Sequence, residues 1–413
     1  MPLDSVLAVR DSFRKRRYTA FAFLFAAGVF CLSYIMCIRE SAYQFVDFQV
    51  HMLIAADFDF ADLHSITSRL AYPLWHLIVS TLYQIGLPIA VSASLVTALC
   101  KAVLFLEVYA LIRACTSDEV PHGIILAVST FLMIVTGIWI PSVSRHVYQG
   151  VGSPTVWHNP TQQIVTAAMM LVIPWLCHCW YEFEKALENQ RDRFTLPAWK
   201  VLVLAVLLMA SLACKPTFMQ ALLPAAFVLF FCELVRYPKY WRYFLQIVLA
   251  FLPAAAYFLL QYLYYTGVVV EYTSGVEIGI TPGTAWIAVR NALMMSACPL
   301  AALILCRKKN MFKNKALLLA VLMVAFSALE AMAFRETGLR EGHGNFTWAA
   351  DSSSFWLWVC TVPVFLESVK ADLKNSVSAF KKAGYGAVGI LFLWHLVSSV
   401  YYLFYLFSTE NAF

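Results

Sequence analysis

The residues best suited to chemistry lie between Glu40 and His76, the most acidic stretch of a very apolar sequence. Asp47 and His51 are four residues apart, so a helix would place both on one face, one turn apart. A carboxylate beside an imidazole suits general base catalysis or contact with an anion. We therefore predict Asp47, His51 and Glu40 as catalytic residues. His76 is expected to contact the substrate.

The sequence Asp57-Phe58-Asp59 has the Asp-x-Asp pattern that often holds a divalent metal on a sugar nucleotide. Patterns of three residues arise often by chance, and the eleven cysteines lack metal-ligand spacing. We therefore predict no metal site and no required cofactor, and the expected chemistry is compatible with a divalent cation.

The string Trp157-His158-Asn159-Pro160 is a second candidate binding motif. A tryptophan either stacks on a sugar or anchors a helix at the membrane surface. Asn159 suits the N-cap and Pro160 the first turn of a following helix, whose free N–H groups would favour a phosphate. We predict Trp157, His158 and Asn159 as substrate contacts, together with Arg145 from the same polar stretch; a plain helix cap with an anchoring tryptophan is the alternative.

Cations and glycines occur at two further places. Lys215 stands alone between two apolar segments, where it either reaches toward the membrane surface or contacts a phosphate. The stretch 335–351 carries Arg340, His343 and Asn345 among several glycines. Arginine pairs with phosphate oxygens, and glycine lets the backbone approach a ligand closely. We predict these four side chains as substrate or phosphate contacts.

The composition indicates a membrane protein. The 413 residues are 61% hydrophobic and 13% charged, whereas soluble domains carry about 25% charged residues. Apolar runs of about 20 residues, the length of a membrane-spanning helix, recur along nearly the whole chain. We predict an all-α polytopic membrane protein that forms a single domain over residues 1–413. The net charge of +6 comes from short basic loops, which are typical of cytoplasmic connections and not of nucleic-acid binding.

Basic residues also set the expected orientation. The cluster Arg14–Arg17 places residues 1–17 in the cytoplasm, so loop 40–71 lies outside, with short amphipathic helices on the membrane. The later basic loops place 335–351 outside too. However, the count of crossings from the first helix and the count back from these loops differ by one between residues 72 and 141. A re-entrant or half-length helix at 72–87 removes this difference, and about eleven spans remain, within a range of about 10–12. The expected apolar segments cover roughly 18–38, 72–87, 89–113, 122–140, 164–181, 199–214, 217–235, 243–265, 284–306, 316–334, 354–368 and 385–407.

This layout resembles the GT-C superfamily of integral-membrane glycosyltransferases, which use polyprenyl-phosphate-linked sugar donors. Those enzymes carry a catalytic Asp or Glu in the first external loop, near the end of helix 1. The nearest carboxylates here are Glu40, Asp47 and the Asp-x-Asp pair, in place of the family's usual paired acidic motif. The stretches around Trp157 and His343 are also similar to those of bacterial membrane proteins in surface-polysaccharide clusters.

The resemblance implies an inverting sugar transfer at the external face of a bacterial inner or plasma membrane. Asp47 would take the proton of the acceptor hydroxyl as that hydroxyl attacks the anomeric carbon. Arg340 and His343, with Lys215 or Arg145, would stabilise the phosphate leaving group. The apolar helices would hold the isoprenoid chain, and the acceptor would be a glycan, a lipid or a protein.

Two other functions fit the same layout. A polysaccharide polymerase or ligase of the O-antigen type would use external Arg145, His146, Arg340 and His343 and would not need a first-loop carboxylate. A transporter or lipid flippase would not be an enzyme, and such proteins usually have internal repeats and paired broken helices. The sequence has no evident repeat and one suspected broken helix.

Overall fold

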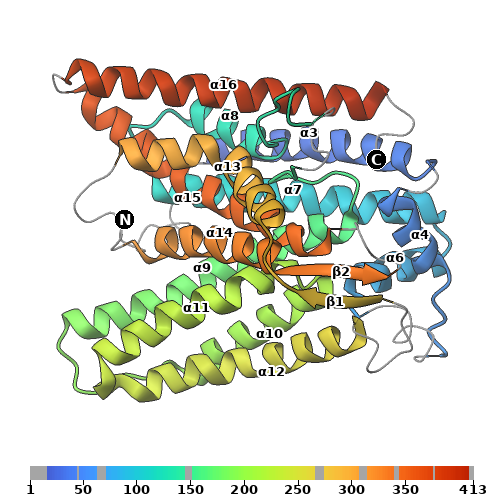
Figure 1. The fold of residues 1–413 in the computed structure, drawn as a ribbon, viewed down its shortest axis with the longest axis horizontal. Helices are drawn as coiled ribbons and strands as arrows, with labels where there is room; N and C mark the ends of the chain where they lie inside the picture. The colour runs from blue at the N-terminus through green and yellow to red at the C-terminus, as the bar shows by residue number, and fades with distance from the viewer. Residues whose placement is uncertain are drawn as a thin grey trace.

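The computed structural model describes residues 16–43, 46–62, 71–144, 151–265, 274–306, 314–338, 344–374 and 377–408. Most helices of this part of the chain run roughly along one direction (Figure 1). Within these ranges, nine helices are long and apolar enough to cross a membrane. The chain is a multi-pass integral membrane protein, which confirms the coarse prediction from composition.

The nine long helices correspond closely to the expected apolar segments. They are α3 (Arg16–Glu40), α7 (Ile89–Cys115), α9 (Pro160–Glu188), α11 (Thr217–Arg236), α12 (Trp241–Tyr265), α13 (Pro282–Leu305), α14 (Lys315–Ala333), α15 (Trp348–Leu373) and α16 (Ala379–Ser408). Two apolar helices are shorter, α8 (His122–Leu132) and α10 (Ala198–Cys214). The total of about eleven spans stays a prediction, because it requires both shorter helices to belong to crossings.

The apolar segment expected over residues 122–140 is helical only in its first part, α8. The chain beyond α8 is not helical, and neighbouring helices satisfy its backbone groups. The N–H groups of Thr136 and Trp139 donate to the hydroxyls of Ser399 and Ser398 on α16, at 3.1 and 2.9 Å. Non-helical backbone is tolerated among transmembrane helices only where protein groups or a cavity replace the missing bonds. Contacts distant in sequence therefore decide the structure of this segment.

Two short helices lie together at one end of the bundle, which we call the α4 end (Figure 1). They are α4 (Asp47–Ala56) and α6 (Leu74–Gln84), and they pack against each other and against α7. The 11 residues of α6 span about 16 Å, well short of the roughly 30 Å of a bilayer core. The segment 72–87 therefore contains a half-length helix, as expected.

A two-stranded antiparallel sheet lies at the same end (Figure 1). Strand β1 (Ser274–Ile278) follows α12, and β2 (Phe334–Gly338) follows α14; Val276 pairs with Glu336. The short 3-10 helix η3 (Asn345–Thr347) leads into α15, and η1 (Pro238–Tyr240) precedes α12. The sequence pattern predicts no strand here, because the two strands are short and far apart in the chain.

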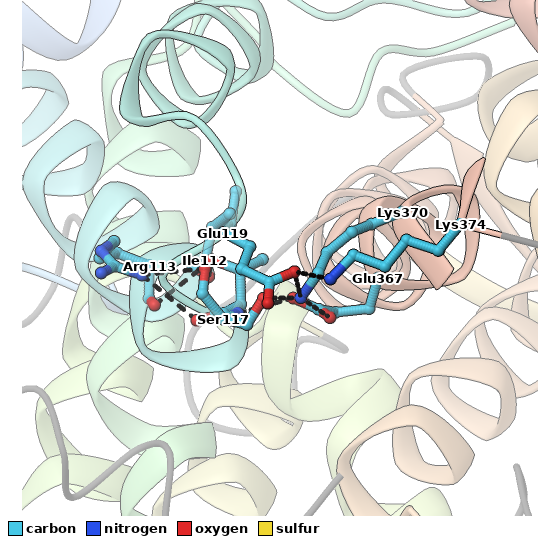
Figure 2. Close-up of polar contacts among 8 residues, drawn as sticks. Ile112, Arg113, Ser117, Glu119, Glu367, Lys370 and Lys374 are labelled. Atoms are coloured by element: carbon cyan, nitrogen blue, oxygen red, sulfur yellow. Dashed lines mark hydrogen bonds and ion pairs between the residues drawn. The ribbon is translucent and has the colours of Figure 1, made fainter. Parts of the chain in front are cut away.

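The opposite end of the bundle is fixed by a polar network between the α7–α8 connection and the end of α15 (Figure 2). The backbone N–H of Ser117 donates to Oε1 of Glu367 at 2.6 Å, and Nζ of Lys370 donates to the Ser117 hydroxyl at 2.5 Å. Glu119 accepts from Lys374 at 2.6 Å and lies 3.0 Å from Lys370. The two bonds made by Ser117 hold the connection before α8 against α15.

Replacing Glu367 with Ala is expected to lower the free energy of unfolding by about 1 kcal/mol, because the Ser117 N–H loses a charged acceptor. Thermal unfolding of the purified protein measures the change. Glu119→Ala is the matched control: it removes only ion pairs at the surface, which contribute little, so its stability should equal that of the wild type. Equal losses in the two variants would contradict this assignment.

Candidate functional site

Asp47 is the first residue of α4, and its carboxylate faces the start of α9. Its Oδ2 accepts a hydrogen bond of 2.9 Å from Nδ2 of Asn159 and lies 3.9 Å from Nε2 of His158. The Asp47 side chain is 45% exposed, whereas that of His158 is 6% exposed. The structure thus brings together three of the predicted residues from two distant stretches, and leaves the carboxylate accessible to a ligand.

The helix cap of α9 fixes how Asn159 contacts Asp47. Oδ1 of Asn159 accepts from the backbone N–H of Gln162 at 2.9 Å and from the Thr161 hydroxyl at 2.7 Å, and Pro160 occupies the first turn, as predicted. Because the side-chain oxygen is used in the cap, the amide nitrogen is the atom that faces the carboxylate. Asn159 therefore serves as a cap and as a donor to Asp47 at once.

Neighbouring groups keep Asp47 ionised. Burial alone raises the pKa of Asp47, but interaction with His158, the hydrogen bond from Asn159 and the charge of Lys215 together lower that pKa below its usual value. Burial lowers the pKa of His158 to about 4, although Asp47 opposes this shift. Since His158 is neutral above that pH, Asn159 and Lys215 are the partners that favour the carboxylate at neutral pH.

Lys215 lies between α10 and α11 and is 4% exposed. Its ammonium is 3.9 Å from the centre of the Trp348 ring, and that ring is 5.6 Å from the ring of His158. Burial lowers the pKa of Lys215 to about 8, while the charges of Asp47 and Asp351 act in the opposite direction. The side chain is therefore mostly charged at neutral pH and places a positive charge beside Asp47.

Gln162 ties three helix starts to one another. Its Oε1 accepts from the Thr217 hydroxyl at 2.9 Å, and its Nε2 donates to the Ser352 hydroxyl at 2.9 Å and to the Trp348 carbonyl at 3.3 Å. The N-termini of α9, α11 and α15 therefore meet here, and the Asp47–Asn159 bond adds that of α4. Each helix N-terminus carries a partial positive charge, so the cluster favours an anionic ligand.

His51 and His76 form a buried pair one turn along α4. Nδ1 of His51 and Nε2 of His76 are 2.9 Å apart, so one ring donates to the other, and both pack against Trp75. Burial lowers the pKa of His51 to about 4, so it is neutral at neutral pH. The side chain of His51 makes its hydrogen bond with His76 of α6 and not with Asp47, although the charge of Asp47 still opposes the effect of burial on the pKa of His51. Among the described residues, Asn159 and His158 contact the Asp47 carboxylate instead.

Glu40 and Trp157 belong to a deeper group near Asp47. Glu40 ends α3 and is 4% exposed, and neither carboxylate oxygen has a hydrogen-bond partner within the described ranges. Lys101 of α7 is the opposite charge that acts on Glu40, and its ammonium lies 4.3 Å from the centre of the Trp157 ring. Trp157 is 1% exposed, so it does not offer a free stacking face for a sugar. This burial does not support the prediction that Trp157 contacts a sugar directly.

Of the remaining predicted residues, the structure describes Asn345, which lines the same pocket as Lys215. Asn345 is in η3, where its side chain donates to Oε1 of Glu336 at 2.5 Å. Arg145, Arg340 and His343 lie outside the described residues. In the part of the chain that is described, no group of three or more His, Cys, Asp or Glu side chains is placed to hold a metal ion.

Sequence reasoning missed three buried polar side chains of this region. Asp351, in the first turn of α15, accepts a 3.1 Å hydrogen bond from the backbone N–H of Ser153. Lys101 lies beneath Trp157, and Gln162 joins the helix starts. Lys101 could have been found, because a lone charge in an apolar span is a candidate functional residue by default. Gln162 carries no such signal, because its contacts come from other helices.

No protein-family model matches the chain, and no curated protein matches it.

Proposed function

We propose that this protein is a membrane glycosyltransferase that moves a sugar from a polyprenyl-phosphate-linked donor to a hydroxyl acceptor at the external face. The observation that carries the proposal is the convergence of Asp47, Asn159 and Lys215 at four helix N-termini. An accessible carboxylate suits proton removal, and a buried cation beside helix N-termini suits a phosphate. The α4 end is external if the basic loops at the opposite end are cytoplasmic.

In the proposed reaction, the acceptor oxygen forms a bond to the anomeric carbon of the donor while the bond from that carbon to the phosphate oxygen breaks. The proton of the acceptor hydroxyl passes to the Asp47 carboxylate, which Asn159 orients through its hydrogen bond. Lys215 and the helix N-termini stabilise the negative charge that develops on the departing phosphate. A single displacement of this kind inverts the configuration of the anomeric carbon.

An apolar groove between α3 and α8 suits the isoprenoid chain of the donor. The groove has a volume of about 330 Å³ and is lined at one side by Trp157. Its lining is almost entirely apolar and includes Phe25, Gly28, Leu32 and Ile134. Because α3 is exposed along this side, the groove faces the surrounding lipid. We assign it to the chain of the donor because Trp157 directly precedes the motif that contacts Asp47.

Replacing Gly28 with Leu is expected to raise the KM for the lipid-linked donor about tenfold, which corresponds to about 1.4 kcal/mol of binding. A Cβ atom at Gly28 meets nothing within 4 Å, so the larger side chain fills the groove without disturbing the fold. Gly386→Leu is the matched control, since Gly386 is also exposed and open but does not line this groove. Steady-state kinetics at varied donor concentration measures the effect. An unchanged KM in Gly28→Leu would place the lipid chain elsewhere.

The broken crossing at α8 favours a second candidate, a transporter or lipid flippase. Transporters often bind their substrates at interrupted helices, and here α8 continues as non-helical backbone held by α16. The residues expected of an O-antigen-type polymerase, Arg145, Arg340 and His343 among them, lie outside the described residues.

Turnover by the purified protein separates an enzyme from a carrier. The protein in phospholipid nanodiscs is incubated with a panel of polyprenyl-phosphate-linked sugars and a mixture of glycan acceptors, and released polyprenyl phosphate is measured. A transferase releases it in amounts that far exceed the protein, whereas a carrier releases none.

A further inference from the structure

A pocket opens beneath the β1–β2 sheet, and we call it the hairpin pocket. It holds about 100 Å³ of free space, several times the roughly 10–15 Å³ that one water molecule needs. Lys215 lies just before α11, the first part of α11 supplies Gln220, and the end of α12 supplies Gln261. Glu336 of β2 and Phe346 of η3 close the opposite side. Gly275 and Val276 of β1 also line it, so five separate elements surround one space at the α4 end.

Hydrogen bonds fix two walls of this pocket. Nε2 of Gln261 donates to the carbonyls of Ala71 and Leu212, both at 2.9 Å. Across the pocket, the Glu336 carboxylate accepts from the backbone N–H of Asn345 at 3.2 Å and from its side chain at 2.5 Å. These bonds leave the pocket largely formed before any ligand binds, which lowers the ordering cost of binding.

Two acceptor atoms of the lining are unused. The side-chain oxygens of Gln220 and Gln261 are buried, and neither accepts a hydrogen bond from the residues that the structure describes. Leaving a buried acceptor unsatisfied costs about 1–3 kcal/mol. For Gln261 the orientation is set, because its nitrogen already makes two bonds. The pocket therefore calls for a ligand with O–H or N–H donors.

The rest of the lining selects a neutral ligand with an apolar face. Aromatic rings of Tyr72, Phe258, Tyr262 and Phe346 line the space. Among the described lining residues, Lys215 and Glu336 are the charged ones, and their charges have opposite signs. Aromatic rings offer flat apolar surfaces that match the C–H face of a sugar. A hydroxyl-rich sugar ring can therefore donate hydrogen bonds to the two amide oxygens and stack its C–H face on the aromatic rings.

We propose that the hairpin pocket is the acceptor subsite and binds an uncharged, hydroxyl-rich saccharide. The inference rests on the proposed transferase function and adds the place and class of the acceptor. Lys215 lines the pocket and lies 3.9 Å from the centre of the Trp348 ring, which packs beside His158, and His158 in turn lies 3.9 Å from Asp47. Contacts between side chains therefore connect the pocket to the proposed base. A saccharide held by Gln220, Gln261 and Phe346 would therefore present a hydroxyl on the side where Asp47 can take its proton.

Saturation-transfer NMR on the full-length protein in phospholipid nanodiscs tests the proposal without requiring turnover. Nanodiscs are needed because maltoside detergents carry sugar head groups. The probes are the methyl glycosides of glucose, galactose, mannose and N-acetylglucosamine. At least one should bind the wild type, and Gln220→Leu and Phe346→Ala should each weaken that binding at least about fivefold. Phe227→Ala on the exposed face of α11 should leave it unchanged.

The outcomes separate this inference from the proposed function. Asp47→Asn should keep saccharide binding, because Asp47 is needed for proton removal and not for holding the ring. If none of the four glycosides binds, or if binding is indifferent to both pocket variants, the acceptor subsite is refuted even when donor turnover depends on Asp47. If binding behaves as expected but no sugar is transferred, the pocket stands as a saccharide site and the transferase proposal fails. Displacement of the probe by phospholipid acyl chains would likewise overturn the inference.

Discussion

Asp47→Asn is expected to lower kcat by about 10²–10⁴-fold, the usual contribution of a general base, with little change in the KM for the donor. The amide has nearly the same shape as the carboxylate, so the site should keep its structure while losing the group that takes the proton. The measurement is release of polyprenyl phosphate from the lipid-linked sugar by purified variants. Circular dichroism and thermal unfolding confirm that the variant is folded.

Asp57→Asn is the matched control for that experiment. Asp57 follows the last residue of the same helix and is exposed, so its substitution should leave kcat at the wild-type value. The same variant tests whether the Asp-x-Asp pattern holds a needed metal, since a loss of activity that added Mg²⁺ or Mn²⁺ restores would indicate one. Full activity of Asp47→Asn would show that Asp47 is not the base. It would favour the alternative of an O-antigen-type polymerase or ligase that uses external Arg and His residues.

The membrane class and most helix positions could be predicted because they depend on local composition. A run of about 20 apolar residues is a property of the segment itself. Residues 133–140 could not be predicted in this way, because their backbone is satisfied by Ser398, Ser399 and Met294. The β1–β2 pairing is likewise set by two segments that meet only after the intervening helices have packed. Local patterns do not contain such partners.

In the candidate site too, features that depend on neighbours in sequence were predictable, and features that depend on packing were not. The cap formed by Asn159 and Pro160 was predictable, since a cap needs only neighbours in sequence. That Asn159 also donates to Asp47 depends on how α4 packs against α9. The pairing of His51 with Asp47 was expected from helix geometry alone, but α6 supplied His76 as the nearer partner. Spacing gives the residues that share a face, whereas packing decides what that face meets.

Lys215→Met is expected to lower kcat by about 10²–10³-fold, comparable to the loss of one donor to a developing negative charge. The methionine keeps an unbranched apolar stem of nearly the same length but removes the charge that lies over Trp348. Lys239→Met, at an exposed position near the start of α12, is the control and should keep full activity. Kinetics with the lipid-linked donor at pH 7 provide the comparison, and equal activity of both variants would exclude Lys215 from phosphate stabilisation.

The pH dependence gives a sharper test of Lys215, because a merely structural lysine would not produce it. The pKa of Lys215 is about 8, so wild-type activity should fall as the pH rises through that value and the ammonium loses its proton. Lys215→Arg should flatten this alkaline limb, since guanidinium stays charged. The stability of the fold should change in the opposite direction. The pKa of Lys215 in the folded protein lies below the ordinary value of 10.5, so between these two values the unfolded chain binds more protons than the folded protein. The free energy of unfolding therefore rises with pH over that interval. Activity that falls while stability rises over the same interval would show that a buried, costly charge is kept for the reaction and not for the fold.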